Sequence, residues 1–413
     1  MTSKVKTSLK ASVKDGVFWA AMFSLAENYS VPFALYLGAG PLAIGILRSL
    51  PVLAASFVQI FAELFVYFFK SCKKVVFWSV FFQAITLTAA SLCAFLEGKT
   101  ALYSFIFFAV LYACFGSLSS APWFTLMGEY LPASSRGRFF GFRNRLIGIS
   151  YFITGIAASL FLKFRGENSL AFFSLFFTAA LARFACAYYI TLMYESFRRF
   201  HIPKTFSGII FPLFEKNENK NVSRVFYAIF ILLFSTYLAA PYFSVYILKD
   251  LKFGYGKYII LSSIGQFLTW FLMKNWGIML DRKGSVKVLT YSFFFIPLVS
   301  LLWIFSRNFY YLTAVEIFSG IAWGAYASGS TALVYEYLSA ALRTRYNSFL
   351  IFLASAAQFS ASILGGLIYD YFDKVYAHPF LFLLALSTAG RFLALKIFWP
   401  LRSLRPNNLP QST

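Results

Sequence analysis

Two acidic side chains lie inside long apolar segments of the sequence, and they are its clearest candidates for chemistry. Glu27 is followed by Asn28 and Tyr29 within one such segment, and Glu316 lies within another. An ionisable group in an apolar, membrane-like environment is costly, which makes it a candidate for binding a polar solute or a proton. A structural hydrogen-bonding role is the alternative for both. Trp323 could stack on a solute, although packing is the usual role of an aromatic residue in a chain with 21% aromatics.

Four further charges lie in or beside apolar segments, and a packing role is favoured for them. Arg183 and Arg391 occupy equivalent positions in two similar segments, as residues of a shared scaffold would. Arg48 can extend its long side chain toward a polar interface. At Glu63, packing competes evenly with a part in gating.

The sequence offers no support for metal, redox or nucleotide chemistry. The two histidines, His201 and His378, both fall in loops, so a histidine proton relay inside the apolar segments is not expected. No G-x-x-x-x-G-K-[ST] loop is present, so ATP is not expected to be used directly. We expect no cofactor, no metal and no enzymatic activity. The absence of CxxC spacing argues against disulfide or metal sites at Cys72, Cys93, Cys114 and Cys186.

The elements that position these side chains are expected to be membrane-spanning helices. The chain of 413 residues is 60% apolar and only 13% charged, which leaves too few polar side chains to coat a soluble protein. The first apolar run continues to Leu37 without a small-residue cleavage site, so we expect a retained helix rather than a signal peptide. Helices of about 20 apolar residues cross a bilayer. The sequence predicts an all-α polytopic membrane protein with twelve spans near residues 16–37, 42–69, 75–96, 101–128, 144–162, 170–194, 224–248, 258–280, 288–305, 310–335, 346–369 and 380–400.

The distribution of basic residues predicts the orientation of the chain. Its net charge is +22, and with both termini placed in the cytoplasm, 24 Lys and Arg fall on that side against 8 on the other. This asymmetry satisfies the positive-inside rule. The positive charge is therefore expected to orient the protein and to contact anionic lipid headgroups, and not to bind nucleic acid.

An internal repeat divides the chain into two similar halves. Residues 129–138 recur as residues 336–345, with six of ten positions identical at an offset of 207. Such self-similarity indicates a duplicated architecture. The predicted domains are a six-helix bundle at 1–194, a cytoplasmic linker at 195–223, and a second six-helix bundle with a short tail at 224–413.

Two parallel six-helix repeats with a cytoplasmic linker resemble the major facilitator superfamily. The loop from Gly277 through Asp281 and Arg282 to Gly284 matches that family's G-x-x-x-D-R-x-G pattern. The resemblance implies that this loop helps to close the cytoplasmic side; an ordinary charged turn is the alternative. The first half departs from the pattern, with Tyr67 near the expected aspartate and Lys70 near the final glycine. Paired segments after the fourth and tenth spans also match the family, and they add the predicted gating residues Glu129, Arg136, Arg138, Glu336, Arg343 and Arg345.

The resemblance implies a secondary-active transporter of a small organic solute, in which two halves rock about a midplane site. A proton or ion gradient is the expected energy source, with Glu27 or Glu316 as the coupling group. Drug or metabolite efflux, lipid translocation and a non-transporting membrane sensor are alternatives that the sequence leaves open. The expected setting is the cytoplasmic (inner) membrane. The expected partners are the solute, membrane lipid and a coupling ion, and the protein is expected to be a monomer.

Overall fold

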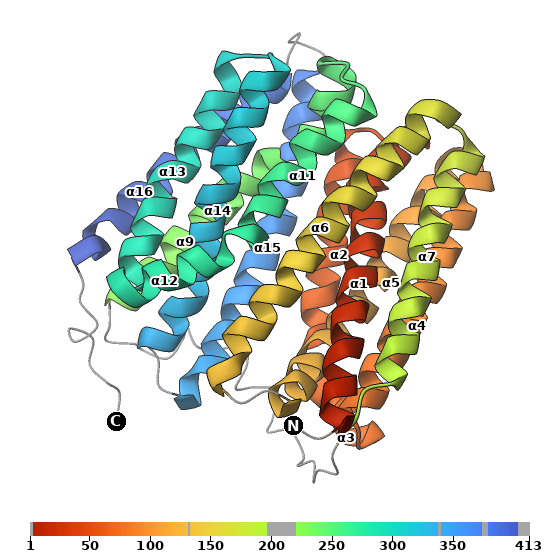
Figure 1. Ribbon diagram of the computed structural model, residues 1–413. Helices are drawn as coiled ribbons and strands as arrows, with labels where there is room; N and C mark the ends of the chain where they lie inside the picture. Colours follow the sequence, from red (N-terminus) through yellow and green to blue (C-terminus); the bar gives the residue numbers. More distant parts are fainter. Residues whose placement is uncertain (1–2, 131–132, 196–219, 338–339, 374–378, 404–413) are drawn as a thin grey trace. The chain divides into compact units, whose positions relative to one another are not determined.

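The computed structural model of the protein describes residues 3–130, 133–195, 220–337, 340–373 and 379–403. Side chains at 129, 133–138, 220–223, 334–337, 340–349 and 403 lie outside this description. Every regular element within these ranges is a helix, which confirms the predicted all-α class (Figure 1). By their internal contacts the residues divide into two units. Unit 1 comprises Met1–Pro203 with Lys252–Ser263, and unit 2 comprises Lys204–Leu251 with Ile264–Thr413.

Unit 1 is a bundle of long helices. Helix α1 packs mainly on α6 and α7, α4 packs on α5 and α7, and α2 packs on α5. Its aromatic core centres on Phe33, whose ring lies 4.8 to 5.2 Å from the rings of Phe105, Phe172 and Phe176. Its helices are α1 (Ser3–Tyr36), α2 (Pro41–Gln59), α3 (Ala62–Phe69), α4 (Cys72–Leu92), α5 (Gly98–Tyr130), α6 (Ala133–Arg165) and α7 (Ser169–Thr191).

Unit 2 is a second helical bundle, in which α9 packs on α15 and α16, and α13 packs on α14 and α16. Phe293 stacks on Phe398 with ring centres 4.2 Å apart. Helix α9 (Lys220–Ala239) leads through short turns to α10 (Phe243–Val245) and a π-helical turn at Tyr246–Asp250. The remaining helices are α11 (Tyr255–Phe271), α12 (Met273–Lys283), α13 (Ser285–Phe305), α14 (Phe309–Tyr337), α15 (Ala340–Phe372) and α16 (Pro379–Phe398). The first half of α11, up to Ser263, belongs to unit 1.

Two helix interruptions recur at corresponding places in the sequence. Helix α2 breaks before α3 at Ile60 and Phe61, and α11 breaks before α12 at Leu272. The helix after each interruption, α3 or α12, ends at a residue with positive φ, which is 49° at Lys70 and 78° at Gly284. Lys70 adopts the left-handed helical conformation with a ψ of 31°, whereas Gly284 has an extended ψ of 161°.

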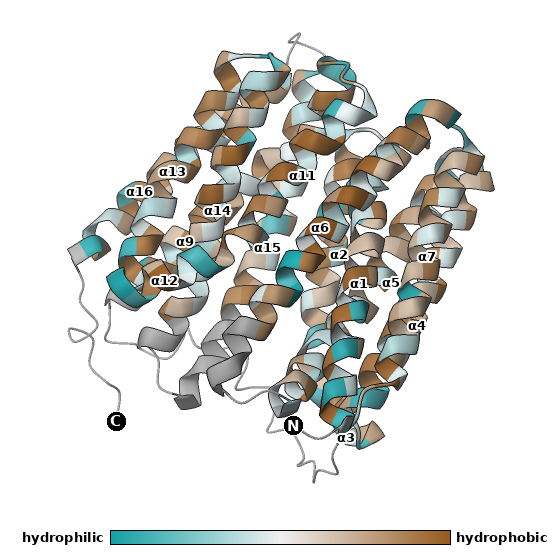
Figure 2. Ribbon diagram, in the orientation of Figure 1, coloured by the Kyte–Doolittle hydropathy of each residue, from teal (hydrophilic) through white to brown (hydrophobic). Residues whose placement is uncertain are grey.

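The helices are those of a multi-pass membrane protein, with apolar residues along most of their lengths (Figure 2). Within the described ranges, nine segments are long and apolar enough to cross a bilayer. The count of twelve spans and the domain boundaries near residues 195 and 224 stay predictions. In the described part of the chain, Cys72, Cys93, Cys114 and Cys186 form no disulfide. The nine segments are Pro41–Gln59, Cys72–Phe95, Gly98–Gly128, Phe139–Arg165, Ser169–Thr191, Arg224–Asp250, Ser285–Phe305, Leu350–Phe372 and Pro379–Arg402.

Candidate functional site

Glu27 of α1 forms an ion pair with Arg48 of α2. The Arg48 Nη1 atom lies 3.3 Å from the Glu27 carboxylate, and it also donates to the Glu27 backbone carbonyl at 3.4 Å. The side chains of Arg48 and Glu27 are 39% and 36% exposed, respectively. The sequence predicted Glu27 as a solute or proton site and Arg48 as a structural charge. The structure brings the two together as one charged group.

Two aromatic residues share the face of α1 that carries Glu27. Trp19, Phe23 and Glu27 are spaced four residues apart, so they align along one side of the helix. Each is partly exposed. The rings of Trp19 and Phe23 stack with centres 5.1 Å apart, and Phe23 lies 6.1 Å from the ring of Tyr151 on α6. An aromatic strip therefore runs along α1 up to the ion pair.

Asn28 points away from this face into a buried hydrogen-bond cluster of unit 1. Tyr151 donates to its side-chain oxygen at 2.8 Å, and Tyr258 of α11 donates to its backbone carbonyl at 2.6 Å. Its amide nitrogen donates to the hydroxyls of Ser24 at 3.2 Å and Ser263 at 3.5 Å. In this conformation both polar ends of the Asn28 amide have protein partners.

Tyr29 is also committed to protein contacts. Its side chain is fully buried, and its hydroxyl donates to the Gly155 carbonyl of α6 at 2.8 Å. A side chain at Gly155 would meet Ser24 and Ile259 at 3.0 Å, so this glycine permits the close approach of α6. Of the three adjacent residues predicted to contact solute, only Glu27 is partly exposed.

Glu316 lies in α14 of unit 2, where its carboxylate accepts a hydrogen bond from the indole of Trp303 at 2.8 Å. Within the described part of the chain, it forms no ion pair shorter than 4.0 Å. Its second oxygen faces Gly265 of α11, where an added Cβ would lie 3.1 Å away. Gly320, one turn further along α14, abuts the Gly265 carbonyl, so small residues bring α11 and α14 together around this acid. Trp323 contacts Tyr326 edge-on at 5.4 Å.

The predicted gating loop forms the end of α12. Gly277, Asp281 and Arg282 lie within this helix, and Gly284 ends it with a backbone hydrogen bond to Leu280. The side chains of Asp281 and Arg282 are exposed. The other predicted gating residues lie in helices, but their side chains fall outside the described set: Glu129, Arg136, Arg138, Glu336, Arg343 and Arg345.

The charges expected to be structural differ in their surroundings. Arg183 is 4% exposed and donates to the Gln83 side chain at 2.6 Å. Arg391 is equally buried and donates to the Ile296 carbonyl at 3.5 Å. Glu63 lies in the first turn of α3, and its side chain is exposed on the protein surface rather than buried within it.

Sequence reasoning missed a buried ion pair between α1 and α6. Arg143 lies 3.5 Å from the Asp15 carboxylate, donates to the Ser12 carbonyl at 3.1 Å, and covers the face of Trp123 at 4.5 Å. The sequence signal was present, because Asp15 is the only acid in the first 26 residues. Its position beside Lys14 made it look like part of a polar flank.

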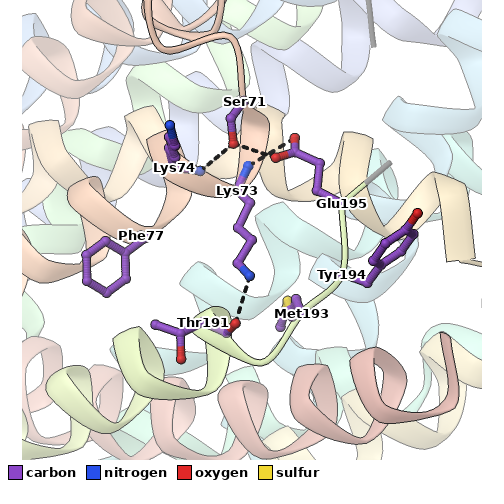
Figure 3. Close-up of a pocket in the computed structure, with 8 residues that line it drawn as sticks. All are labelled: Ser71, Lys73, Lys74, Phe77, Thr191, Met193, Tyr194 and Glu195. Atoms are coloured by element: carbon purple, nitrogen blue, oxygen red, sulfur yellow. Dashed lines mark hydrogen bonds between the residues drawn. The ribbon is translucent and has the colours of Figure 1, made fainter. Parts of the chain in front are cut away.

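A pocket of about 480 Å³ at the start of α4 also escaped sequence reasoning (Figure 3). Glu195, just after α7, accepts hydrogen bonds from the Ser71 hydroxyl and from the Cys72 and Lys73 backbone N–H groups. The Lys73 ammonium donates to the Thr191 carbonyl at 2.7 Å. A carboxylate at a helix N-terminus satisfies its free N–H groups, so this contact ties the end of α7 to the start of α4.

Comparisons with known proteins agree with this architecture. The family model of the Major Facilitator Superfamily matches residues 225–413. No curated protein matches the chain in sequence.

Solved transporter structures share the fold at low sequence identity. The crystal structure of the nucleoside transporter NupG has a TM-score of 0.68 at 16% identity and covers 98% of this chain and 100% of its own. A bacterial homologue of the iron transporter ferroportin, in an inward-facing state, has a TM-score of 0.71 at 12% identity, with coverage of 98% and 100%. A bacterial homologue of the human lysosomal transporter Spinster, inward-facing and occupied, has a TM-score of 0.69 at 10% identity, with coverage of 99% and 98%.

Residues 225–413 thus match the Major Facilitator Superfamily in sequence, and nearly the whole chain shares its fold with solved transporter structures.

Proposed function

We propose that the protein is a secondary-active transporter that moves a small organic solute by alternating access, with a proton gradient as its energy source. The observation that carries this proposal is the different setting of Glu27 and Glu316, the two acids that stood out within apolar segments. Glu27 is held in an ion pair with Arg48, whereas Glu316 has the Trp303 indole as its partner and no ion pair among the described residues. Paired and unpaired acids are suited to different tasks, and we assign solute binding to Glu27 and coupling to Glu316.

The assignment follows from the cost of burying charge. A carboxylate without a close cation in an apolar surrounding is stabilised by taking up a proton or by drawing in a cation. The Trp303 N–H can donate a hydrogen bond to Glu316 whether its carboxyl group is ionised or protonated, because each of these forms keeps an acceptor oxygen. Arg391 interacts electrostatically with Glu316 from α16, and it would compensate the charge when the proton leaves. Glu27 already has its compensating charge in Arg48.

The test separates coupling from binding. A thermal-shift screen of the purified protein against metabolites first supplies a transported solute, and the protein is then reconstituted into proteoliposomes. Glu316→Gln is expected to abolish uphill accumulation driven by a proton gradient and to preserve exchange of labelled for unlabelled solute. Glu27→Gln is expected to abolish both. Glu97→Gln, the same change at an exposed turn, serves as the matched control and should retain both.

Two outcomes would contradict the proposal. Unchanged accumulation by Glu316→Gln would show that this acid does not couple transport to protons. Solute binding by the wild-type protein without any exchange would instead indicate a membrane sensor on the same fold.

The proposal includes a topology and a gate. We place the protein in the cytoplasmic membrane as a monomer with both termini in the cytoplasm, supported by the excess of Lys and Arg on that side. The end of α12, with Asp281 and Arg282 exposed, is then cytoplasmic and available for a closing contact. The same assignment makes the Glu195 contact at the start of α4 a cytoplasmic one.

A further inference from the structure

Unit 1 carries a surface that we name the charged face of α1. It consists of Trp19, Phe23 and Glu27 on α1 together with Arg48 on α2. Helix α1 packs closely on α6 and α7 but touches α2 only slightly. All four side chains are partly exposed there.

The charges of this face favour water or solute over lipid as its surroundings. Glu27 lies in the apolar part of α1, because a turn of buried apolar residues, Val31–Ala34, follows it before the helix ends at Tyr36. Holding two charges against hydrocarbon costs several kcal/mol, and such groups in membrane proteins face the interior or a polar path. The ion pair leaves more than a third of each side chain accessible.

From this arrangement we propose that the transported solute is a zwitterion with an apolar or aromatic body. A solute with an ammonium and a carboxylate can insert at the pair with its ammonium on Glu27 and its carboxylate on Arg48. Every charge then keeps an opposite charge as its partner. A solute with one charge would separate the pair and leave one protein charge without its partner, which is unfavourable.

The rest of the face selects the body of the solute. Trp19 and Phe23 present stacked rings in line with the carboxylate, one and two turns away on the same side of α1. Such a surface favours an apolar side chain, and the face of an aromatic ring also attracts an ammonium group. The combination fits a small amino-acid-like molecule better than a sugar, which would need several neutral hydrogen-bonding partners.

This inference rests on the proposed transport function, but its test needs neither a membrane nor a gradient. The purified protein in detergent is titrated with two series of matched probes, and its unfolding temperature is followed. One series is phenylalanine, phenylpropanoate and phenethylamine; the other is leucine, methylpentanoate and methylbutylamine. Within each series the body is kept while the ammonium or the carboxylate is removed. We expect the zwitterion of at least one series to bind about tenfold or more tightly than either partner.

Variants assign each charge to its protein partner. Glu27→Gln is expected to weaken zwitterion binding about tenfold or more and to shift the preference toward the carboxylate probe. Arg48→Gln is expected to shift the preference toward the amine probe. The exposed residues Glu97 and Arg165 supply matched controls, Glu97→Gln and Arg165→Gln, which should leave the preference unchanged. If Arg48→Gln does not fold, the exchanged pair Glu27→Arg with Arg48→Glu keeps both charges and should still prefer the zwitterion.

Three results would overturn the inference: a singly charged probe that binds the wild type as well as its zwitterion, no binding by either zwitterion, or an unchanged preference in the Glu27 and Arg48 variants. Failure of transport gives a different pattern. A protein that prefers zwitterions but exchanges no solute would contradict the transport function and leave the recognition intact.

Discussion

Buried charges of the two units are compensated by different partners, and these partners decide which residues can be functional. Arg183 and Arg391 stand at equivalent places in the repeat, but Arg183 donates to the amide of Gln83 and Arg391 to a backbone carbonyl. The nearby acid is Asp15 of α1 in unit 1 and Glu316 of α14 in unit 2. The arginines are thus common to both units, whereas the acids that act on them come from different helices.

The Asp15–Arg143 pair leads to a prediction about stability. Asp15→Asn leaves the Arg143 guanidinium buried without its anion, and loss of one partner of a buried ion pair costs about 3 kcal/mol of unfolding free energy. The double variant Asp15→Asn with Arg143→Gln removes both charges and should recover part of that loss. Thermal unfolding in detergent measures both. A loss in the double variant equal to the sum of the losses in Asp15→Asn and Arg143→Gln would show that the pair contributes nothing beyond its separate residues.

Sequence could find the ionisable residues of the site but not their partners. Glu27 stood out because a carboxylate in an apolar run is unusual. Its pairing with Arg48, 21 residues away on another helix, depends on how α1 is rotated toward α2. The same rotation turns Asn28 into a buried cluster with Tyr151 and Ser263, although it is adjacent to Glu27 in the chain. Side-chain direction around a helix is set by tertiary packing, which local sequence does not specify.

The two corresponding helix ends differ in backbone conformation as well as in residue type. The sequence aligned Tyr67 with Asp281 and Lys70 with Gly284, and it suggested that the first copy of the loop was altered. Both α3 and α12 end at a residue with positive φ, but ψ is 31° at Lys70 and 161° at Gly284. A lysine in the left-handed region could not have been foreseen, since glycine is the residue that adopts it at little cost.

This pair of helix ends predicts opposite effects of two substitutions. Gly284→Ala places a Cβ at a φ of 78° and a ψ of 161°, a region that is essentially restricted to glycine, and should lower the free energy of unfolding by about 1–3 kcal/mol. Lys70→Gly relieves a left-handed conformation at a φ of 49° and a ψ of 31°, and should be neutral or stabilising, despite the greater freedom of glycine in the unfolded chain. Unfolding temperatures of the two variants in the same detergent provide the comparison. A marked destabilisation by Lys70→Gly would mean that the lysine side chain makes a contact worth more than the strain.

In the molecule as a whole, three long helical segments are too polar or too interrupted to count among the nine apolar spans, and these segments contain the candidate acids. Helix α1 contains Glu27 and Asn28, α14 contains Glu316, and the α11–α12 segment is broken at Leu272 and ends in charged residues. Polar groups lower the mean hydropathy of a span, and an interruption shortens it, so a working transport helix looks less like a membrane helix than a scaffold helix does. The apolar pattern therefore predicted the scaffold more securely than the site.

If these three segments also cross the bilayer, the nine apolar spans become twelve. An even number of crossings returns the chain to its starting side, whereas nine would leave the two termini on opposite sides. We therefore expect a fluorescent reporter that matures only in the cytoplasm to be active at either end of the chain, and a periplasmic phosphatase reporter to be inactive at both. An active phosphatase at the C-terminus alone would mean an odd number of crossings. At least one polar helix would then lie outside the membrane, and its acid could no longer contribute to a solute path.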